Sequence, residues 1–511
     1  MSRIVGMRGL LASSIGVTCA AALALPLIPP AVAAAGGASA SPTPTVEAAA
    51  PATARAAEPD LPGSTQSLPL APLTRDRDGS ATLTPGTGTA EQGLPRRDVR
   101  HFSLVGVVWD DPDTELHGRV EVRTRAAGTG TWSGWQGVET HNGDHGADPD
   151  TPERTSGHVR GATAPLWVGD SDGVEVRVDA EPGTGGPSRV EETGRGPRTV
   201  TAPGAPLPSG LRLELVDPGR ADSGLTAPGA RPGRLHAPVA APRTGAVSAR
   251  FPPPGADGEL TAEAAAVSAT NADLVPLGAT EIPALTRQQT EQELRTLPAA
   301  DQEERQRAKP YIGPRPRIVT RRGWGASESL REEGFVYTTK VKAAFVHHTA
   351  SGNTYKCSQV SSVIRSIYRY HVKSMGWRDI GYNFLVDKCG NIYEGRAGGV
   401  AKPVKGAHTL GFNGNSMGIA VIGTFGSSKP TSAAVKAIAR LTAWKLGLYG
   451  ANPRGKTYLT SGGGNLYRKG KKVRLNVISG HRDGFATDCP GRQLYGKLGS
   501  ARKTAARYQG R

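Results

Sequence analysis

The chain has 511 residues, which is enough for roughly two to four domains. Hydrophobic residues make up 37% of it and aromatic residues only 5%, while glycine and proline number 67 and 40. That composition excludes a chain packed into a core throughout. Beyond the N-terminus, no apolar run is long enough to span a bilayer, which excludes a multi-span membrane protein.

The N-terminus has the pattern of a signal peptide, which we place at residues 1–35. Arg3 and Arg8 precede a long apolar run, and the small residues that follow include an A-x-A match at 31–33. The alternative is an N-terminal membrane anchor. Three prolines interrupt the run and favour cleavage, so we expect a secreted, extracellular protein.

The cysteines indicate one thiol with a separate task. Of the four, Cys19 lies in the signal peptide, and Cys357, Cys389 and Cys489 remain. An odd number in an exported protein leaves one cysteine outside intramolecular pairing. We predict a disulfide between Cys357 and Cys389, because the compartment is oxidising, with the reduced pair as the alternative. Cys489 would then be single.

Two long stretches predict linkers on either side of a β-rich domain. Residues 36–97 are rich in Ala, Pro, Thr and Gly and predict a low-complexity linker. Residues 218–308 have a similar composition and predict a spacer with one short exposed helix. Between them, residues 98–217 alternate apolar and charged side chains, which predicts a small antiparallel β-domain with the architecture of a sandwich. Its tryptophans fit a core better than a sugar-stacking surface: Trp109, Trp132, Trp135 and Trp167.

Residues 309–511 have the pattern of a globular α/β domain. The runs VKAAFVHHT, MGIAVIGTF and RLNVISGH predict buried strands, and YNFLVD with NIYEG predicts a hairpin. Amphipathic helices are predicted from Ser358 and from Thr431, the second ending at Gly447. We therefore predict a central mixed β-sheet flanked by helices.

Charge is concentrated in this last domain. Residues 309–511 hold 35 basic and 8 acidic residues, a net of +27, whereas the rest of the chain holds 27 basic and 37 acidic residues. Such an excess predicts attraction to a polyanion. Export disfavours nucleic acid and favours anionic cell-wall polymers; the alternative is a surface that only promotes solubility.

Two predicted strands end in histidines, and a cysteine follows the second. His347 and His481, with Cys489, would supply two imidazoles and a thiolate, which are good zinc ligands. Three protein ligands leave a fourth position for water, as in catalytic zinc sites. From spacing alone, a surface or core histidine pair is an equally good interpretation. A Cys489 nucleophile with His481 as its base is the competing chemistry, but it leaves His347 unexplained.

Five motifs in one order resemble the peptidoglycan recognition protein family, which is related to zinc amidases. They are RRGWGA, FVHHTA, GYNFLVDKCGNIYEGR, GAHTLGFNGNSMGIAVIG and SGHRDGFATDCPG, and the resemblance covers roughly 200 residues. It implies a mixed sheet with helices, a groove for a glycan-linked peptide, and Zn²⁺ held by His347, His481 and Cys489. It implies that Tyr382 is catalytic, and it places Thr487 where amidases have Thr or Lys. The β-rich domain resembles N-terminal regions of other exported bacterial amidases.

The resemblance also gives candidates for substrate binding. They are His408, Arg396 and Asn413 in the groove. The alternative for His408 is a role in a turn, and Arg396 could hold a stem-peptide carboxylate or simply brace a loop. His348 and His371 are interpreted as structural histidines. Asp483 could orient a ligand histidine or form a surface ion pair.

We expect a secreted, monomeric, zinc-dependent N-acetylmuramoyl-L-alanine amidase that acts on peptidoglycan at the cell wall. The alternatives are a non-catalytic peptidoglycan-binding module and a wall adhesin in which the β-rich domain dominates. Cys489 favours the enzyme, since non-catalytic members of the family typically lack the ligand cysteine. A departure from the animal pattern after the EGR motif leaves the preference at the third stem-peptide residue open.

Overall fold

The computed structural model describes residues 62–75, 81–83, 91–181, 189–193, 196–200, 206–219, 260–296 and 310–511. The predicted signal peptide, most of the predicted linker and much of the predicted spacer lie outside these residues. Among the described residues, no helix combines the length and the apolar character needed to cross a bilayer.

The N-terminal part of the described chain is a nine-stranded sheet in which all pairs are antiparallel, as predicted. Its central strands β4 and β8 are long and carry register shifts, which bend them. The strands are β1 (Ser64–Pro69), β2 (Ala71–Arg75), β3 (Ala81–Leu83), β4 (Glu91–Trp109), β5 (Gly118–Ala126), β6 (Gln136–Val138), β7 (Gly161–Ala162), β8 (Leu166–Ala180) and β11 (Arg212–Asp217), with a separate hairpin of β9 (Arg189–Thr193) and β10 (Gly196–Val200).

The boundary predicted for the linker at residue 97 needs correction. Strand β1 and the first residues of β4 lie inside the range predicted as linker. The short β1 pairs along its whole length with β11, so backbone pairing rather than a hydrophobic pattern orders it. Of the four tryptophans, Trp109 and Trp167 are buried, whereas Trp132 and Trp135 are half-buried and stack with arginines such as Arg123.

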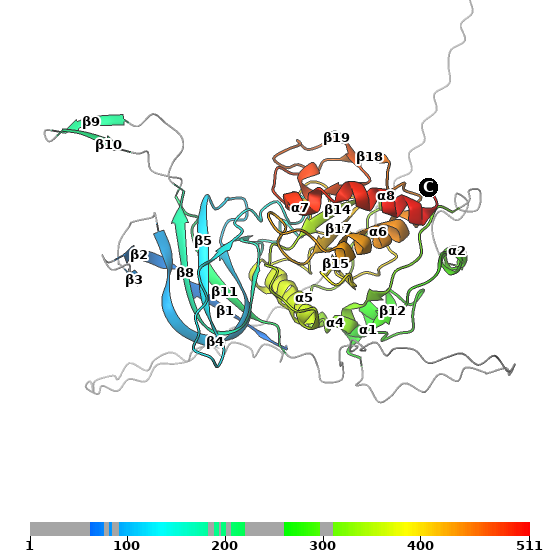
Figure 1. The fold of residues 1–511 in the computed structure, drawn as a ribbon, viewed down its shortest axis with the longest axis horizontal. Coiled ribbons are helices and arrows are strands. Elements are labelled where there is room, and N and C mark those ends of the chain that lie inside the picture. Colours follow the sequence, from blue (N-terminus) through cyan, green and yellow to red (C-terminus); the bar gives the residue numbers. More distant parts are fainter. Residues whose placement is uncertain are drawn as a thin grey trace, which may run out of the picture. The chain divides into compact units, whose positions relative to one another are not determined.

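The C-terminal part has the predicted α/β fold, a seven-stranded mixed sheet with helices on its faces (Figure 1). Along the sheet the strands are β12 (Glu281–Ile282), β13 (Ile318–Val319), β16 (Ile392–Glu394), β15 (Phe384–Val386), β17 (Ser416–Val421), β14 (Ala343–His348) and β20 (Ile478–Gly480). A separate hairpin consists of β18 (Lys456–Thr460) and β19 (Lys472–Asn476). The run RLNVISGH, predicted as one strand, is therefore split between two sheets.

The helices follow the predicted amphipathic segments. Thr431 caps α6 as predicted, accepting a hydrogen bond from Ala434 N, but Ser358 lies inside η2 and is not a cap. The helices are α1 (Ala262–Ala269), α2 (Arg287–Thr296), α4 (Arg321–Trp324), α5 (Val360–Arg369), α6 (Ser432–Gly447), α7 (Arg492–Tyr495) and α8 (Leu498–Gln509), with the short turns η1 (Glu328–Leu330), η2 (Cys357–Gln359), η3 (Tyr370–Ser374) and η4 (His481–Asp483).

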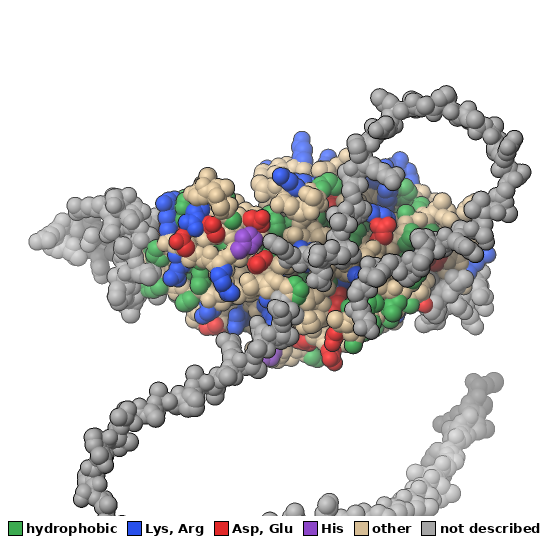
Figure 2. Space-filling model, turned by 90° about the horizontal axis from the view of Figure 1, so that it is seen from below, with side chains coloured by type: hydrophobic (Ala, Val, Ile, Leu, Met, Phe, Trp, Pro, Cys, Tyr) green, Lys and Arg blue, Asp and Glu red, His purple; other side chains and the backbone are tan. Residues whose placement is uncertain are grey.

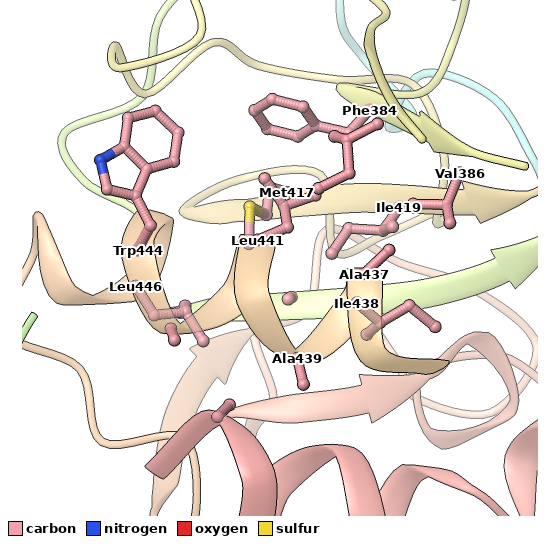
Figure 3. Close-up of a cluster of buried hydrophobic side chains, with 14 of the residues drawn as sticks. Phe384, Val386, Met417, Ile419, Ala437, Ile438, Ala439, Leu441, Trp444 and Leu446 are labelled. Atoms are coloured by element: carbon pink, nitrogen blue, oxygen red, sulfur yellow. The ribbon is translucent and has the colours of Figure 1, made fainter. Parts of the chain in front are cut away.

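The main core lies between α6 and the sheet (Figure 3). Leu441 and Ile438 of α6 lie near Met417 and Ile419 of β17, and all four are buried. Each such side chain contributes about 1.5–3 kcal/mol by leaving water. The burial holds the strands whose ends carry the predicted site residues.

Part of the predicted spacer belongs to this fold, which corrects its boundary. Helices α1 and α2 and strand β12 come from residues 260–296, and Val275, Ile282 and Leu294 are buried in the main core. Only a few apolar side chains, set among Ala and Pro, make these contacts. Their spacing gave no periodic signal, so composition alone was misleading here.

The β-rich sheet and the α/β part share a hydrophobic cluster. Leu104 and Val216 of the β-rich sheet are buried together with Ile364 of α5 and Tyr370 of η3. The Tyr370 hydroxyl donates a hydrogen bond to Thr163 O at 3.1 Å. The two parts are thus packed against each other within one compact unit, residues 58–511, rather than joined only by a tether.

Candidate metal centre

Two parallel strands bring the predicted histidines together. Strand β20 pairs in parallel with β14, so Val346 lies beside Gly480, and a histidine follows each of these two residues in the sequence. Because the carboxyl ends of parallel strands meet at one edge, the rings of His347 and His481 lie 4.5 Å apart between centroids. Cys489 returns to the same edge, with Sγ 3.8 Å from His347 Nδ1. The structure therefore brings the three predicted ligands together.

A fourth donor, absent from the sequence-based prediction, lies at the same point. His145 comes from the segment between β6 and β7 of the β-rich sheet, and its Nε2 is 3.9 Å from Cys489 Sγ. The donor atoms of His145, His347, His481 and Cys489 all lie within 4.8 Å of one another, and all four residues are buried. The predicted vacant fourth position is therefore wrong for this conformation.

The four residues fit a zinc ion. Burial, reinforced by neighbouring imidazoles, holds the pKa of His347 well below its usual value, and burial lowers the pKa of His481 to about 3. Both rings are thus neutral, as ligands must be. Neither ring nitrogen of buried His481 has a hydrogen-bond partner among the described residues. Burial raises the pKa of the Cys489 thiol, so its thiolate requires a nearby cation.

Oxygen atoms lie beside the histidine rings, outside the group of four donors. The Asp144 carboxylate is within hydrogen-bonding distance of His145 Nδ1, at 2.9 Å, and lies 3.6 Å from His481 Nδ1, too far for a hydrogen bond. The Thr409 hydroxyl lies 3.4 Å from His347 Nε2. This outer arrangement of carboxylate and hydroxyl partners is typical of metal-binding histidines, because it sets the tautomer and the ring orientation.

Two hydroxyl-bearing residues predicted for catalysis flank the centre. The buried ring of Tyr382 lies 5.6 Å from that of His347 between centroids. Burial raises the pKa of Tyr382 well above its usual value, so its phenol keeps its proton and can donate a hydrogen bond. Thr487 is half-buried, and its hydroxyl accepts a hydrogen bond from Cys489 N at 3.1 Å.

The three residues predicted to bind substrate lie in different surroundings. Arg396 is buried, and both of its terminal nitrogens donate hydrogen bonds to the Glu153 carboxylate, at 2.9 and 2.7 Å. The Asn413 side-chain amide donates to Gly146 O at 2.8 Å. His408 is fully buried, with its ring 5.3 Å from that of His347. Substrate binding by these residues stays a prediction.

The remaining histidines and cysteines have structural contacts. His348 Nδ1 accepts a hydrogen bond from Phe425 N, and His371 Nδ1 accepts one from Gly381 N. Cys357 and Cys389 form a disulfide with their Cα atoms 6.5 Å apart, which confirms the predicted pairing. Cys489 is the free cysteine of the described chain.

Asp483 braces a turn rather than a ligand ring. Its carboxylate accepts hydrogen bonds from Gly480 N at 2.9 Å and from the Tyr495 hydroxyl at 2.6 Å. These contacts hold the backbone that places His481. Neither of the two roles considered from the sequence, a partner of a ligand histidine or a surface ion pair, describes this position.

Sequence reasoning missed the residues that reach this site from the β-rich sheet. They lie in HNGDHGADPDTPERT, residues 141–155, and are Asp144, His145, Asp148 and Glu153. The available signal was a pair of histidines four residues apart, with several carboxylates, in a stretch without any strand pattern. Function is often carried by such long, polar, irregular segments.

Comparisons with known proteins identify relatives of both parts of the chain. Residues 337–492 match a family model described as N-acetylmuramoyl-L-alanine amidase. Residues 50–204 match a second one, described as Rv3811 N-terminal galactose-binding domain-like. The two matches correspond to the α/β part and the β-rich sheet.

Individual relatives match the α/β part. Peptidoglycan-recognition protein SC2 of Drosophila simulans is 31% identical over 181 residues, which are 35% of this chain and 84% of that protein. The human N-acetylmuramoyl-L-alanine amidase is 31% identical over 185 residues, 36% of this chain and 28% of that protein. The crystal structure of peptidoglycan recognition protein-LE in complex with tracheal cytotoxin shares 32% identity, covers 36% of this chain and 92% of that one, and has a TM-score of 0.28.

Proposed function

Since the chain belongs to the peptidoglycan recognition protein family, we propose that it is a zinc-dependent N-acetylmuramoyl-L-alanine amidase. The reaction is hydrolysis of the amide bond between N-acetylmuramic acid and L-alanine of peptidoglycan. The observation that carries the proposal is the convergence of His347, His481 and Cys489 at one sheet edge. Two imidazoles and one thiolate are a ligand set that suits Zn²⁺.

The side chains around the centre suit the needs of amide hydrolysis. A zinc ion held by His347, His481 and Cys489 would activate water and polarise the substrate carbonyl. The neutral Tyr382 phenol can donate a hydrogen bond to the oxygen on which negative charge develops, and we assign it that role. The Thr487 hydroxyl, which accepts a hydrogen bond from Cys489 N, is assigned a second contact with that oxygen. Arg396 is assigned a carboxylate of the stem peptide.

The alternative of a non-catalytic recognition protein is weighed on the fourth donor. Four protein donors are typical of structural zinc sites, and His145 completes such a set. However, the same segment also contacts Arg396 and Asn413. It therefore covers groups that a recognition protein would need as well, and so it does not favour binding over catalysis.

We also propose that the protein is exported and acts at the cell wall, where peptidoglycan is its partner. The signal-peptide pattern supports export. Figure 2 shows one face of the molecule on which Lys and Arg side chains are intermixed with Asp and Glu. The support for long-range attraction to anionic wall polymers is therefore the excess of basic residues in 309–511.

The test uses full-chain protein on isolated peptidoglycan and follows the release of peptide from muramic acid. Wild type and His145→Ala are compared, because His145 occupies the fourth position of the set. Release that a chelator abolishes and zinc restores supports the amidase. Cys489→Ser should remove both zinc and activity. If zinc-loaded His145→Ala binds peptidoglycan and releases nothing, the recognition alternative is correct.

A further inference from the structure

The segment that carries His145 also covers the surface next to the candidate metal centre. We call residues 144–153 the covering segment. It lies within the stretch 139–160, which contains no helix or strand and joins β6 to β7. Irregular connections of this length in compact domains commonly act as lids or binding loops.

At its beginning, the covering segment is held at the metal centre. Asp144 O accepts a hydrogen bond from Leu410 N at 3.0 Å. The Asp144 carboxylate holds His145 through Nδ1, which leaves Nε2 pointing toward Cys489. A histidine backed by a carboxylate is oriented as a ligand rather than as a filler of space. The chain therefore positions His145 for the fourth position of the set.

In its middle, the covering segment supplies acceptors to a group of amides. The Asp148 carboxylate accepts hydrogen bonds from Gly411 N, Asn413 N and the Asn413 side chain, at 3.0, 3.2 and 2.8 Å. Lys405 Nζ lies 3.4 Å from its other oxygen. Gly146 has φ of +135°, which favours glycine, and its carbonyl reaches Asn413. The backbone conformation thus places the Gly146 carbonyl and the Asp148 carboxylate within hydrogen-bonding distance of the amides of Gly411 and Asn413.

At its end, the covering segment pairs with the guanidinium of a buried arginine. Arg396 and Glu153 form two parallel hydrogen bonds, and both side chains are largely buried. Bidentate pairs of this kind have strict geometry. Arg396 is the residue to which we assign a carboxylate of the substrate. Glu153 therefore takes the same donors that a peptide carboxylate would use.

We propose that the covering segment is a built-in blocker that holds the enzyme in a closed, latent form. His145 fills the fourth position of the metal, and Asp148 and Glu153 occupy the donors assigned to substrate. The segment must leave for peptidoglycan to bind. The movable element is the segment alone, because the β-rich sheet stays packed through the cluster it shares with α5. The claim of latency rests on the proposed amidase function, whereas the closure rests on the contacts.

The test compares full-chain variants with matched controls. His145→Ala removes the fourth donor, and Glu153→Gln weakens the pair with Arg396. The controls are His117→Ala, an exposed histidine directly before β5, and Asp150→Asn, an exposed member of the segment whose partner is the exposed Lys469. Circular dichroism and thermal melting establish that each variant is folded.

Three measurements are made on each protein. The first is the visible absorption of the Co²⁺-substituted form, which reports the number and type of ligands. The second is binding of a soluble N-acetylmuramoyl tripeptide, and the third is release of peptide from isolated peptidoglycan. We expect His145→Ala to change the cobalt spectrum and to lower metal affinity by at least about tenfold. Both His145→Ala and Glu153→Gln should bind the tripeptide, and release peptide, about 10–100-fold better than wild type.

The outcomes separate this inference from the proposed function. An unchanged cobalt spectrum in His145→Ala overturns the ligand assignment. Wild type that binds and releases as well as both variants overturns latency and leaves the amidase standing. Variants that gain tripeptide binding but release nothing support the closure and overturn the amidase. Controls that gain as much as the two variants overturn the specific role of His145 and Glu153.

Discussion

The Arg396 guanidinium holds the carboxylate of Glu153, a residue 243 positions earlier in the chain, through two hydrogen bonds of 2.9 and 2.7 Å. One partner belongs to the β-rich sheet's long connection and the other to the α/β part. Arg396 Nε also donates a hydrogen bond to Ile380 O at 2.9 Å, so Glu153 is not the sole partner that holds it. In this structure the hydrogen-bond donors of Arg396 are paired with the Glu153 carboxylate.

Weakening this pair should loosen the covering segment without unfolding the protein. In Glu153→Gln one charged acceptor is lost, and a hydrogen bond to a charged group contributes about 1.5–3 kcal/mol. We expect amide hydrogen exchange in residues 144–153 to rise by about tenfold or more. Asp150→Asn, in the same segment but exposed, should leave exchange as in wild type. Equal exchange in wild type and Glu153→Gln would show that the pair does not hold the segment.

Removing the Tyr382 hydroxyl should affect the chemical step. In a His145→Ala background, Tyr382→Phe is expected to lower kcat by about 10²–10³, the usual effect of losing one donor to a developing oxyanion. Zinc content and KM should change little, because the phenol is not in the ligand set. Tyr370→Phe is the matched control, since that buried hydroxyl is bonded to Thr163 O. Unchanged turnover in Tyr382→Phe would remove this tyrosine from the mechanism.

A buried charge cluster near α4 should dominate stability. Arg321 is buried and pairs with the buried carboxylates of Glu328 and Asp379, at 2.8 and 3.0 Å. Arg321→Ala leaves both carboxylates without this partner, and we expect unfolding free energy to fall by about 3–5 kcal/mol. The control is Arg317→Ala, whose pair with Glu281 is exposed and should contribute below about 1 kcal/mol. Urea denaturation of both variants measures the difference.

Glu394 should make stability depend on pH. Burial raises its pKa to about 7, against hydrogen bonds from Asn271 and Arg321 N. The folded protein favours the protonated form of Glu394. The contribution of this group to the unfolding free energy is therefore fully present below the pKa of the unfolded chain, near 4.5, and is lost as the pH rises to about 7. The unfolding free energy of wild type, minus that of Glu394→Gln, should fall on the order of 3 kcal/mol across this window.

The matched control for that titration is Glu333→Gln, at an exposed position. Its pH profile of stability should follow that of wild type. Denaturation curves at several pH values between 4.5 and 7.5 give the comparison. Parallel profiles for wild type and Glu394→Gln would show that folding does not raise the pKa of Glu394.

Local patterns in the sequence determined much of the α/β part and three of its site residues. Apolar runs that end in histidine place His347 and His481 at strand ends, and parallel pairing then brings strand ends together. Thr431 as the cap of α6 follows from a contact within one turn. The count of cysteines outside the signal peptide predicted the disulfide of Cys357 and Cys389. In each case the signal lies within a short window or in the residue type itself.

Only the tertiary structure shows which distant residues contact these site residues. His145 meets Cys489 across 344 positions, and no periodicity near either residue reports the other. The same holds for residues 260–296, whose few apolar side chains are ordered only by the core they enter. Periodicity records which face of an element is buried, but not which distant segment buries it. The difference between an open and a closed metal centre therefore depends on packing between the two parts, which only the folded chain reveals.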